Sequence, residues 1–204
     1  MCRHLAYLGP PVTLRAAIID PPLGLYRQAW APRMMRGSGT MNIDGFGAGW
    51  YADGDPVPAR YRNSGPIWAD PSFADLTRVT RSGALLAAVI GLLDQAGVTG
   101  RFNFLLTDGR VIAATTAGHT LFYRQGHDQG ADSVTVVSEP SDEDPAWTEV
   151  PDRSLVAATA SDVKVSPLPV PPEVTADSAE RVQHSSFPKG MAATTSPDGR
   201  NPSQ

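Results

Sequence analysis

Cys2, the single cysteine of the chain, directly follows Met1 in the opening sequence Met1-Cys2-Arg3-His4. Met1 ahead of a small residue is expected to be removed, which would leave Cys2 with both a thiol and a free α-amine. An α-amine titrates near ~7.7–8.0, so it can accept the proton of the neighbouring thiol near neutral pH. A thiol becomes a strong nucleophile when an adjacent base produces the thiolate, and an N-terminal amine is one such base. Cys2 is therefore a candidate catalytic nucleophile; the alternative is an ordinary residue at the start of a strand.

A second candidate site is the segment from Asn42 to Tyr51, in which Gly45, Gly47 and Gly49 occupy every second position. A dinucleotide-binding loop is disfavoured, because Trp50 stands where the third glycine of G-x-G-x-x-G would be. Glycine at period two leaves one face of a strand without side chains, so a ligand or another backbone can approach closely. The opposite face would carry Phe46, Ala48 and Trp50. The glycine face is either the floor of a binding site or part of a tightly packed sheet.

The remaining polar residues suggest no metal or cofactor. The histidines, His4, His119, His127 and His184, are dispersed and lack a second cysteine or a carboxylate at metal-ligand spacing. The acidic run Asp142-Glu143-Asp144 is expected to be a solvated turn rather than a metal cradle. Two arginine pairs are expected to be solvated, with anion contact as the alternative: Arg33 with Arg36, and Arg60 with Arg62.

Length and composition describe a soluble globular protein. The chain has 204 residues, 41% hydrophobic and 19% charged, which is enough for one domain with a substantial core. A formal net charge of −4 and a pI near 5.5 argue against nucleic-acid binding, since no basic stripe is available for phosphates.

Compartment signals favour the cytoplasm. One cysteine cannot form an internal disulfide, which fits a reducing environment. A signal peptide is not expected, because Arg3 and His4 precede only a short apolar stretch, broken by Gly9-Pro10-Pro11. No segment approaches the ~20 apolar residues of a membrane span.

Local patterns predict a mixed fold with a strand-rich second half. Thr13 is expected to cap a helix at 14–19, and Ser72 a helix at 73–79. Asp53-Gly54 and Asp108-Gly109 predict hairpin turns. The other expected helices are 23–30 and 91–96, and the expected strands are 2–8 (ended by Gly9-Pro10), 46–51, 59–62, 84–90, 102–107, 111–116, 119–124, 134–138 and 155–159. From about Pro167 the chain is rich in Pro, Ser, Thr and Asp, so we expect a domain at 1–165 and a disordered tail at 166–204.

Taken together, several segments resemble the class II glutamine amidotransferases, which are N-terminal nucleophile hydrolases. The similarity is closest to the ergothioneine-biosynthesis branch, whose members remove γ-glutamate from γ-glutamyl-hercynylcysteine sulfoxide. The resemblance spans about residues 1–165, and its combination of motifs is more specific than any single one. The segments that carry it are 1–9, 42–51, 81–89, 103–109, 138–140 and 144–147.

The resemblance implies an α+β fold, a four-layer α/β/β/α sandwich with the catalytic residue in the cleft between two antiparallel sheets. The Cys2 thiolate would attack the γ-carbonyl of a small-molecule γ-glutamyl substrate, form a thioester, and release glutamate to water. The segment beside the nucleophile would supply the substrate-binding residues Asn42, Asp44, Gly45 and Gly47.

The chain departs from the family after its Ala-Ala-Val strand, where Val89 is followed directly by Ile90-Gly91-Leu92. Family members continue with an arginine that holds the glutamyl α-carboxylate, then a His-Asn-Gly oxyanion motif and an aspartate that binds the α-amine. Here Asn103 is followed by Phe104, and Asp108 belongs to a hairpin turn. We expect an internal deletion of several tens of residues near Val89/Ile90.

The deletion leaves three interpretations open. The chain is an amidohydrolase of this branch, or an impaired or inactive remnant of it that still folds or binds a ligand. Loss of an oxyanion donor alone typically lowers the rate by about 10²–10³. A domain that feeds ammonia to a synthase is a weaker alternative, because no synthase domain accompanies it.

Overall fold

The computed structural model describes residues 3–34, 41–90, 103–128 and 130–168. The chain divides into two compact units, residues 1–168 and 169–204, and the second lies outside the described residues. Most of the tail expected from residue 166 is therefore not described, and its disorder stays a prediction. Cys2 and the helix expected at 91–96 also lie outside the described residues.

The described residues form short helices and mostly antiparallel strands. The helices are α1 (Leu14–Ile18), α2 (Leu25–Gln28), the 3-10 helix η1 (Ile67–Ala69) and α3 (Pro71–Val79). The strands are β1 (Arg3–Thr13), β2 (Gly45–Trp50), β3 (Ala59–Asn63), β4 (Arg81–Ile90), β5 (Leu105–Thr107), β6 (Ile112–Thr115), β7 (Phe122–Asp128), β8 (Ala131–Val137), β9 (Thr148–Glu149), β10 (Ser154–Ala158) and β11 (Val163–Pro167).

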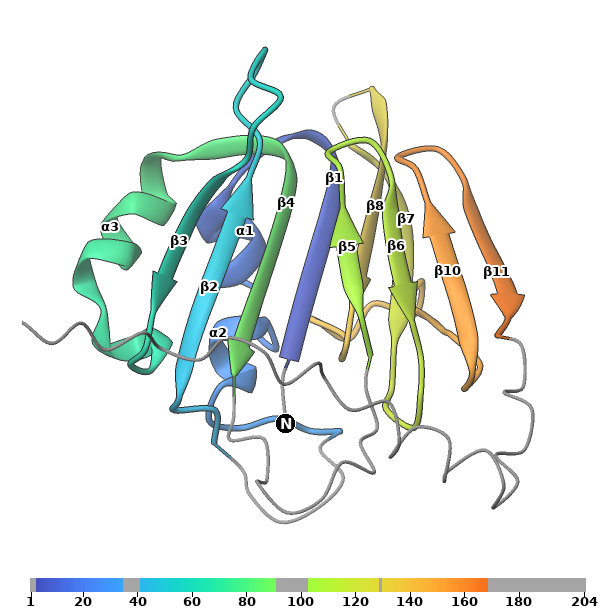
Figure 1. Cartoon of the computed structure of the whole chain (residues 1–204), viewed down its shortest axis with the longest axis horizontal. Helices are drawn as coiled ribbons and strands as arrows, with labels where there is room; N and C mark the ends of the chain where they lie inside the picture. Colours follow the sequence, from blue (N-terminus) through green and yellow to red (C-terminus); the bar gives the residue numbers. More distant parts are fainter. Residues whose placement is uncertain (1–2, 35–40, 91–102, 129, 169–204) are drawn as a thin grey trace, which may run out of the picture. The chain divides into compact units, whose positions relative to one another are not determined.

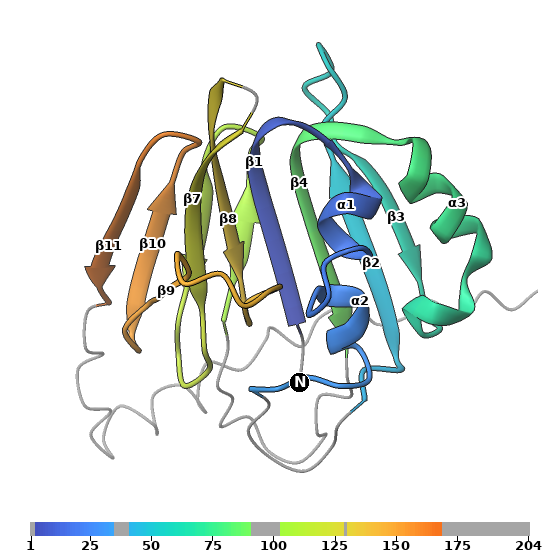
Figure 2. The same cartoon turned by 180° about the vertical axis from the view of Figure 1, so that it is seen from behind.

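The strands form two antiparallel sheets. The larger sheet has seven strands in the order β3-β2-β4-β1-β8-β7-β9, and the smaller has four in the order β11-β10-β6-β5. Figures 1 and 2 show α1, α2 and α3 on one face of the larger sheet, and β5 and β6 on its other face. The described residues thus make three layers, helices, larger sheet and smaller sheet, with β1 at the centre of the larger one.

Strand alternation divides the core between the two faces of β1. Leu5 and Tyr7 belong to the cluster packed against the helices, whereas Ala6 and Leu8 pack in a second cluster with Ile112 of the smaller sheet. Because successive side chains of a strand point to opposite faces, one strand contributes to both cores. Up to Leu8, the sheet-to-sheet face of β1 is therefore the face of its even-numbered residues.

Both helices for which a cap was predicted are present, but the second begins earlier than expected and has a different cap. The Thr13 side chain accepts a hydrogen bond from the Ala16 N–H at 3.1 Å, which confirms it as the cap of α1. The prediction that Ser72 caps the next helix is wrong. Asp70 is the cap of α3 and accepts from the Phe73 N–H at 2.9 Å, while Pro71 begins the helix. Proline is well suited to the first position of a helix, so α3 begins two residues earlier than expected and the residue before Pro71, an aspartate, becomes the cap.

The two predicted hairpins are confirmed, but the predicted bounds of several elements are wrong. β2–β3 and β5–β6 are the predicted hairpins, and Gly54 and Gly109 have φ of 78° and 88° in their turns. The first strand does not end at Gly9-Pro10 as expected; β1 continues to Thr13 with a register shift between Leu8 and Val12. β7 begins at Phe122 rather than residue 119, α2 is shorter than 23–30, and β9 and β11 were not predicted.

These features give an α+β fold. The helices on the larger sheet and the face-to-face sheets account for three layers of the expected four-layer sandwich. A helical layer over the outer face of the smaller sheet is not among the described residues. Within the described part of the chain, no helix has the length and apolar character needed to cross a membrane.

Candidate active site

Strand β1 begins at Arg3, the residue that follows Cys2 in the sequence. Cys2 itself lies outside the described residues, so its role as nucleophile stays a prediction. β1 pairs with β4 from Arg3 onward and with β8 from Leu5 onward. The backbone that follows Cys2 is therefore held within the middle of the larger sheet.

A buried ion pair holds the first residue of β1. Arg3 Nη2 lies 3.6 Å from Glu139 Oε2, and each side chain is 2% exposed. The Glu139 carboxylate also accepts the backbone N–H groups of Arg33 at 2.7 Å and Met34 at 2.9 Å. Burial lowers the pKa of Arg3, and the Glu139 charge opposes that shift. Glu139 thereby joins the start of β1 to the segment that follows α2.

The second residue of β1, His4, is buried on the face directed at the smaller sheet. Its backbone N–H donates to Ser138 Oγ at 3.2 Å, and its carbonyl accepts the Ser138 N–H at 3.1 Å. The side chain is 8% exposed, and Nε2 has no hydrogen-bond partner among the described residues. Burial lowers the pKa of His4 to about 4, with smaller contributions from the charges of Arg3 and His119. The imidazole is therefore neutral near neutral pH.

The glycine segment forms β2 as predicted. Phe46 and Ala48 pack in the core on the helical side, which confirms that one face of this strand is apolar. Gly45, Gly47 and Gly49 lie on the opposite face, which is the face shared with the even residues of β1. Gly45 has φ of 142°, and a Cβ there would lie 2.8 Å from the Asn63 carbonyl oxygen. Close packing against β3 thus explains the glycine at position 45 without a ligand. Gly47 and Gly49 leave the rest of this face of the strand without side chains.

The other predicted substrate residues lie in the segment that leads into β2. Asn42 is fully buried; its N–H donates to the Ala29 carbonyl at 2.7 Å, and its Nδ2 to the Gln28 carbonyl at 3.5 Å. Its Oδ1 has no partner within the described residues. Asp44 is half-buried immediately before β2. β4 separates β2 from β1, so these residues lie two strands away from the start of β1.

No protein-family model matches the chain. The chain is 33% identical over 233 aligned positions to the γ-glutamyl-hercynylcysteine sulfoxide hydrolase of Mycolicibacterium smegmatis, with 82% of this chain and all of that protein covered. This chain belongs to the γ-glutamyl-hercynylcysteine sulfoxide hydrolase family. The hydrolase of the same name from Mycobacterium tuberculosis is 31% identical over 233 positions, covering 82% of this chain and 97% of that protein. The family is one of hydrolases.

A solved structure supports the fold of this family member. A glutamine aminotransferase class-II domain protein from Silicibacter pomeroyi superposes with a TM-score of 0.57 at 18% identity, over 82% of this chain and all of that chain. The resemblance to class II glutamine amidotransferases is therefore confirmed at the level of fold.

Alignment lengths agree with an internal deletion in this member of the family. Since 82% of 204 residues is about 167, roughly 66 of the 233 aligned positions have no residue in this chain. β4 ends at Ile90, and the segment directly after it, at the expected junction, lies outside the described residues.

Asn103, the one asparagine near the junction that the structure describes, has a structural role. Its Nδ2 donates to the carbonyls of His119 at 3.3 Å and Thr120 at 3.1 Å, and its Oδ1 accepts the Ala117 N–H at 2.9 Å. Because both ends of the amide are engaged with backbone groups, Asn103 has little capacity left to stabilise an oxyanion. This agrees with the expectation that Asn103 is not the family's oxyanion asparagine.

Glu143 and Asp144 of the acidic run are exposed, as expected of a solvated turn, but Asp142 is half-buried and the run is held by an arginine. Asp142 and Asp144 lie 3.0 Å and 3.2 Å from Arg124 Nη1, and Trp147 Nε1 donates to Asp142 at 2.7 Å. The Arg124 guanidinium also stacks over the Trp147 ring at 4.5 Å. Burial acts to raise the pKa of Asp142, but hydrogen bonds from Trp147 and the Asp144 N–H, with the Arg124 charge, lower it overall. The ion pairs with Arg124 thus hold Asp142 and Asp144 against β7, on the helical face of the larger sheet.

That helical face also carries a hollow of about 600 Å³, lined among others by Tyr7, Arg124 and Asp142. It contains none of the glycines of β2 and lies on the face opposite to them. We therefore place the candidate site on the sheet-to-sheet face.

Sequence reasoning missed the buried partners at the start of β1. It singled out Cys2 but assigned no role to Arg3, His4 or Glu139. Glu139 lies two residues after the end of strand β8, and a charged residue in that position was a usable signal for a buried ion pair. The identity of its partner depended on the strand order, which local patterns do not encode.

Proposed function

We propose that this chain hydrolyses the γ-glutamyl amide bond of a small molecule in the cytoplasm, with Cys2 as nucleophile and its own α-amine as base. The names of the relatives indicate γ-glutamyl-hercynylcysteine sulfoxide as the substrate and glutamate as one product. Removal of Met1 is required, because it creates the free amine.

The reaction would proceed in two stages. The amine takes the thiol proton, and the sulfur attacks the γ-carbonyl carbon to form a tetrahedral oxyanion. Collapse breaks the amide C–N bond, the ammonium donates its proton to the leaving nitrogen, and a glutamyl thioester remains on Cys2. The amine then takes a proton from water, whose oxygen attacks the thioester and releases glutamate as the thiol is restored.

The observation that carries this proposal is the buried anchoring of the residues directly after Cys2. Arg3 is paired with Glu139, and the His4 backbone donates its N–H to Ser138 Oγ and accepts the Ser138 N–H at its carbonyl. A nucleophile that must meet a carbonyl carbon at roughly 3 Å gains from a fixed backbone, because misplacement by 1 Å can reduce the rate ~10²-fold. Fixed contacts at the two following residues provide that constraint.

The test compares wild type with three variants: Cys2→Ala, Cys2→Ser, and a chain with glutamate inserted between Met1 and Cys2 so that Met1 is retained. Glutamate released from γ-glutamyl-hercynylcysteine sulfoxide is measured, and intact mass reports Met1 processing in each protein. We expect no turnover for Cys2→Ala and at least a ~10²-fold loss when Met1 is retained, because the base is then absent. Wild-type turnover in Cys2→Ala or in the protein that retains Met1 would remove the proposal.

A second candidate function is binding without chemistry, by a remnant of the family. It is favoured by the engagement of the Asn103 amide with backbone groups and by the sequence after Val89, which lacks the family's arginine and His-Asn-Gly motif. A glutamine-analogue electrophile followed by intact-mass measurement separates the two candidates. Stoichiometric labelling that is lost in Cys2→Ala supports a working nucleophile, and no labelling of the wild type supports the remnant.

A further inference from the structure

One row of residues crosses four strands of the larger sheet on the face that carries the β2 glycines. His4 of β1 pairs with Ala88 of β4, Ala88 pairs with Gly47 of β2, and Gly47 pairs with Arg62 of β3. Neighbouring strands lie about 4.8 Å apart, so the row spans roughly 14 Å between its end Cα atoms. Its two middle residues carry only a methyl group and a hydrogen. We call this arrangement the His4–Arg62 row: a low floor between two long polar side chains.

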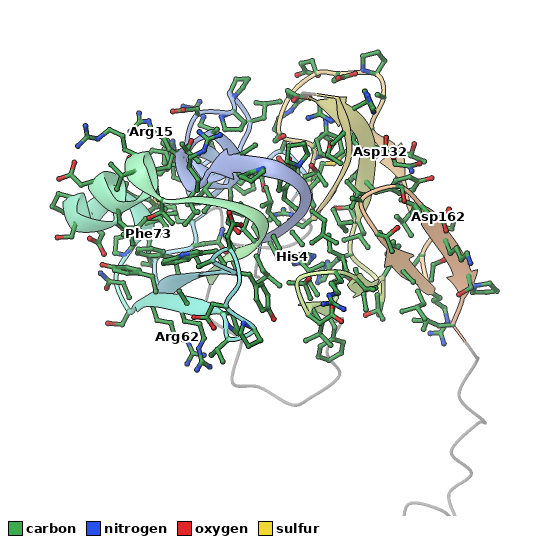
Figure 3. The ribbon with its side chains drawn as sticks, turned by 90° about the horizontal axis from the view of Figure 1, so that it is seen from above. His4, Arg15, Arg62, Phe73, Asp132 and Asp162 are labelled. Atoms are coloured by element: carbon green, nitrogen blue, oxygen red, sulfur yellow. The ribbon has the colours of Figure 1, made fainter. Side chains whose placement is uncertain are left out.

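Figure 3 shows His4 and Arg62 on the side of the sheet away from Arg15 and Phe73, which belong to the helical layer. The placement agrees with strand alternation, since His4 shares its face with Ala6 and Leu8, which pack toward the smaller sheet. The row therefore lies on the same face as the candidate site.

At one end of the row stand two exposed arginines. Arg60 pairs with Gly49, so its side chain lies on the same face as that of Arg62, two residues along the strand. Within the described residues neither guanidinium forms an ion pair with a carboxylate, whereas Arg15, Arg33 and Arg124 each do. Two like charges about 7 Å apart repel, and an anion bound beside them relieves that repulsion. The chain as a whole has a net charge of −4. Two neighbouring arginines that lack carboxylate partners among the described residues therefore favour the binding of an anion.

At the other end of the row stands the imidazole of His4. It is more than nine-tenths buried, and its Nε2 has no hydrogen-bond partner among the described residues. A buried polar atom without a partner is unfavourable, so a ligand group that forms a hydrogen bond with it removes that cost. As far as the described residues go, the row thus has a polar atom without a hydrogen-bond partner at one end and two arginines without a carboxylate partner at the other.

We propose that the His4–Arg62 row binds a small carboxylate-bearing molecule, whose carboxylate contacts Arg62 with help from Arg60. The body of the ligand lies over Ala88 and Gly47, and a polar group reaches Nε2 of His4. Glycine at position 47 suits this role, because a Cβ there would lie 3.3 Å from the Tyr61 carbonyl oxygen and 3.7 Å from Cγ of Arg62, and would raise the floor beside the Arg62 stem. That the carboxylate belongs to a γ-glutamyl compound rests on the proposed function.

The test is calorimetric binding of L-glutamate, L-glutamine and L-isoglutamine to the full-length chain, wild type and Arg62→Gln. We expect L-glutamate and L-glutamine, which both carry the α-carboxylate, to bind the wild type. L-isoglutamine, which lacks the α-carboxylate, should bind at least tenfold more weakly, and Arg62→Gln should weaken the binding of L-glutamate about tenfold or more. The matched control is Arg78→Gln, which removes the same charge from the exposed face of α3 and should leave affinity unchanged.

The outcomes separate this inference from the proposed function. Binding of L-glutamate that Arg62→Gln weakens and Arg78→Gln does not supports the inference, even when no γ-glutamyl hydrolysis is detected. Equal affinities of wild type and Arg62→Gln, equal losses in both arginine variants, or no binding of any of the three probes to the wild type would overturn it. Arg62 is exposed on an edge strand, so its substitution should not unfold the chain.

Discussion

The guanidinium of Arg3 lies 3.6 Å from the carboxylate of Glu139, and both side chains are 2% exposed. The pair joins the first residue of the central strand β1 to the residues directly after β8. The Glu139 carboxylate also accepts the backbone N–H groups of Arg33 and Met34, whereas Arg3 Nε and Nη2 have no hydrogen-bond partner among the described residues. The charge of Arg3 is thus tolerated in the core chiefly because of Glu139.

Replacement of Glu139 with glutamine should therefore destabilise the fold strongly. The variant keeps the shape of the side chain but leaves Arg3 as an uncompensated buried charge, so we expect a loss of about 3 kcal/mol in the free energy of unfolding. The matched control is Asp75→Asn, which breaks an exposed pair with Arg78 and should cost less than about 1 kcal/mol. Denaturant unfolding measures both, and similar losses would contradict a buried, paired Glu139.

His4 should make the stability of the fold depend on pH. Burial lowers its pKa to about 4, below the ordinary 6.5, so between these values the unfolded chain binds a proton that the folded chain does not. Stability therefore falls as pH decreases from about 6.5 toward 4, by up to about 3 kcal/mol. In His4→Gln this part of the pH dependence should disappear. His127→Gln, an exposed control, should retain it. Denaturant unfolding at a series of pH values provides the comparison, and identical slopes in His4→Gln and wild type would argue against the assignment.

Asp70 should matter more than Ser72 for the helix α3. The Asp70 carboxylate caps the Phe73 N–H and accepts from Tyr61 Oη and Asn63 Nδ2, both at 2.6 Å. Asp70→Ala should therefore cost about 2 kcal/mol or more in unfolding free energy. Ser72→Ala, at an exposed position, should change it by less than about 0.5 kcal/mol. Thermal unfolding of the two variants tests the ranking, which the reverse order would refute.

The same carboxylate should contribute to acid sensitivity. Burial acts to raise the pKa of Asp70, but hydrogen bonds from Tyr61, Phe73 and Asn63 outweigh it and lower the pKa below the ordinary 3.8. The stabilising contribution of Asp70 is complete when the pH is above its pKa in the unfolded chain. It is lost as the pH falls through the lower pKa that Asp70 has in the folded chain. Asp70→Asn should reduce the loss of stability in this acidic range, measured against wild type.

Gly45 and Gly49 should respond differently to alanine, although both lie on the glycine face of β2. A Cβ at Gly45 would lie 2.8 Å from the Asn63 carbonyl oxygen, and its φ of 142° is strained for an L-residue. At Gly49 the nearest atom, the Ala59 carbonyl oxygen, would be 3.6 Å away, an ordinary contact. We expect Gly45→Ala to lose about 1–3 kcal/mol of unfolding free energy and Gly49→Ala less than 1 kcal/mol. Equal losses in denaturant titrations would show that the strain is not specific to Gly45.

Features encoded within a few neighbouring residues could be predicted from the sequence. The turns at Gly54 and Gly109 have the positive φ that their Asp-Gly signals predict, and Thr13 caps α1. The two-residue period of glycine in β2 predicted its two unlike faces, because alternation is a property of the strand itself. The resemblance predicted the family and fold, but not what surrounds Cys2.

Only the tertiary structure decided which distant residues share a face or a partner. The sequence contained Glu139, Arg3, His4 and Arg62, yet their relationships follow from the order β3-β2-β4-β1-β8. Strand order and register depend on how whole hydrophobic faces pack, and several orders satisfy the same local pattern. The Asp70 cap and the attraction of Asp142 to Arg124 were missed for the same reason, since a polar side chain goes to whichever partner the packed fold brings within reach.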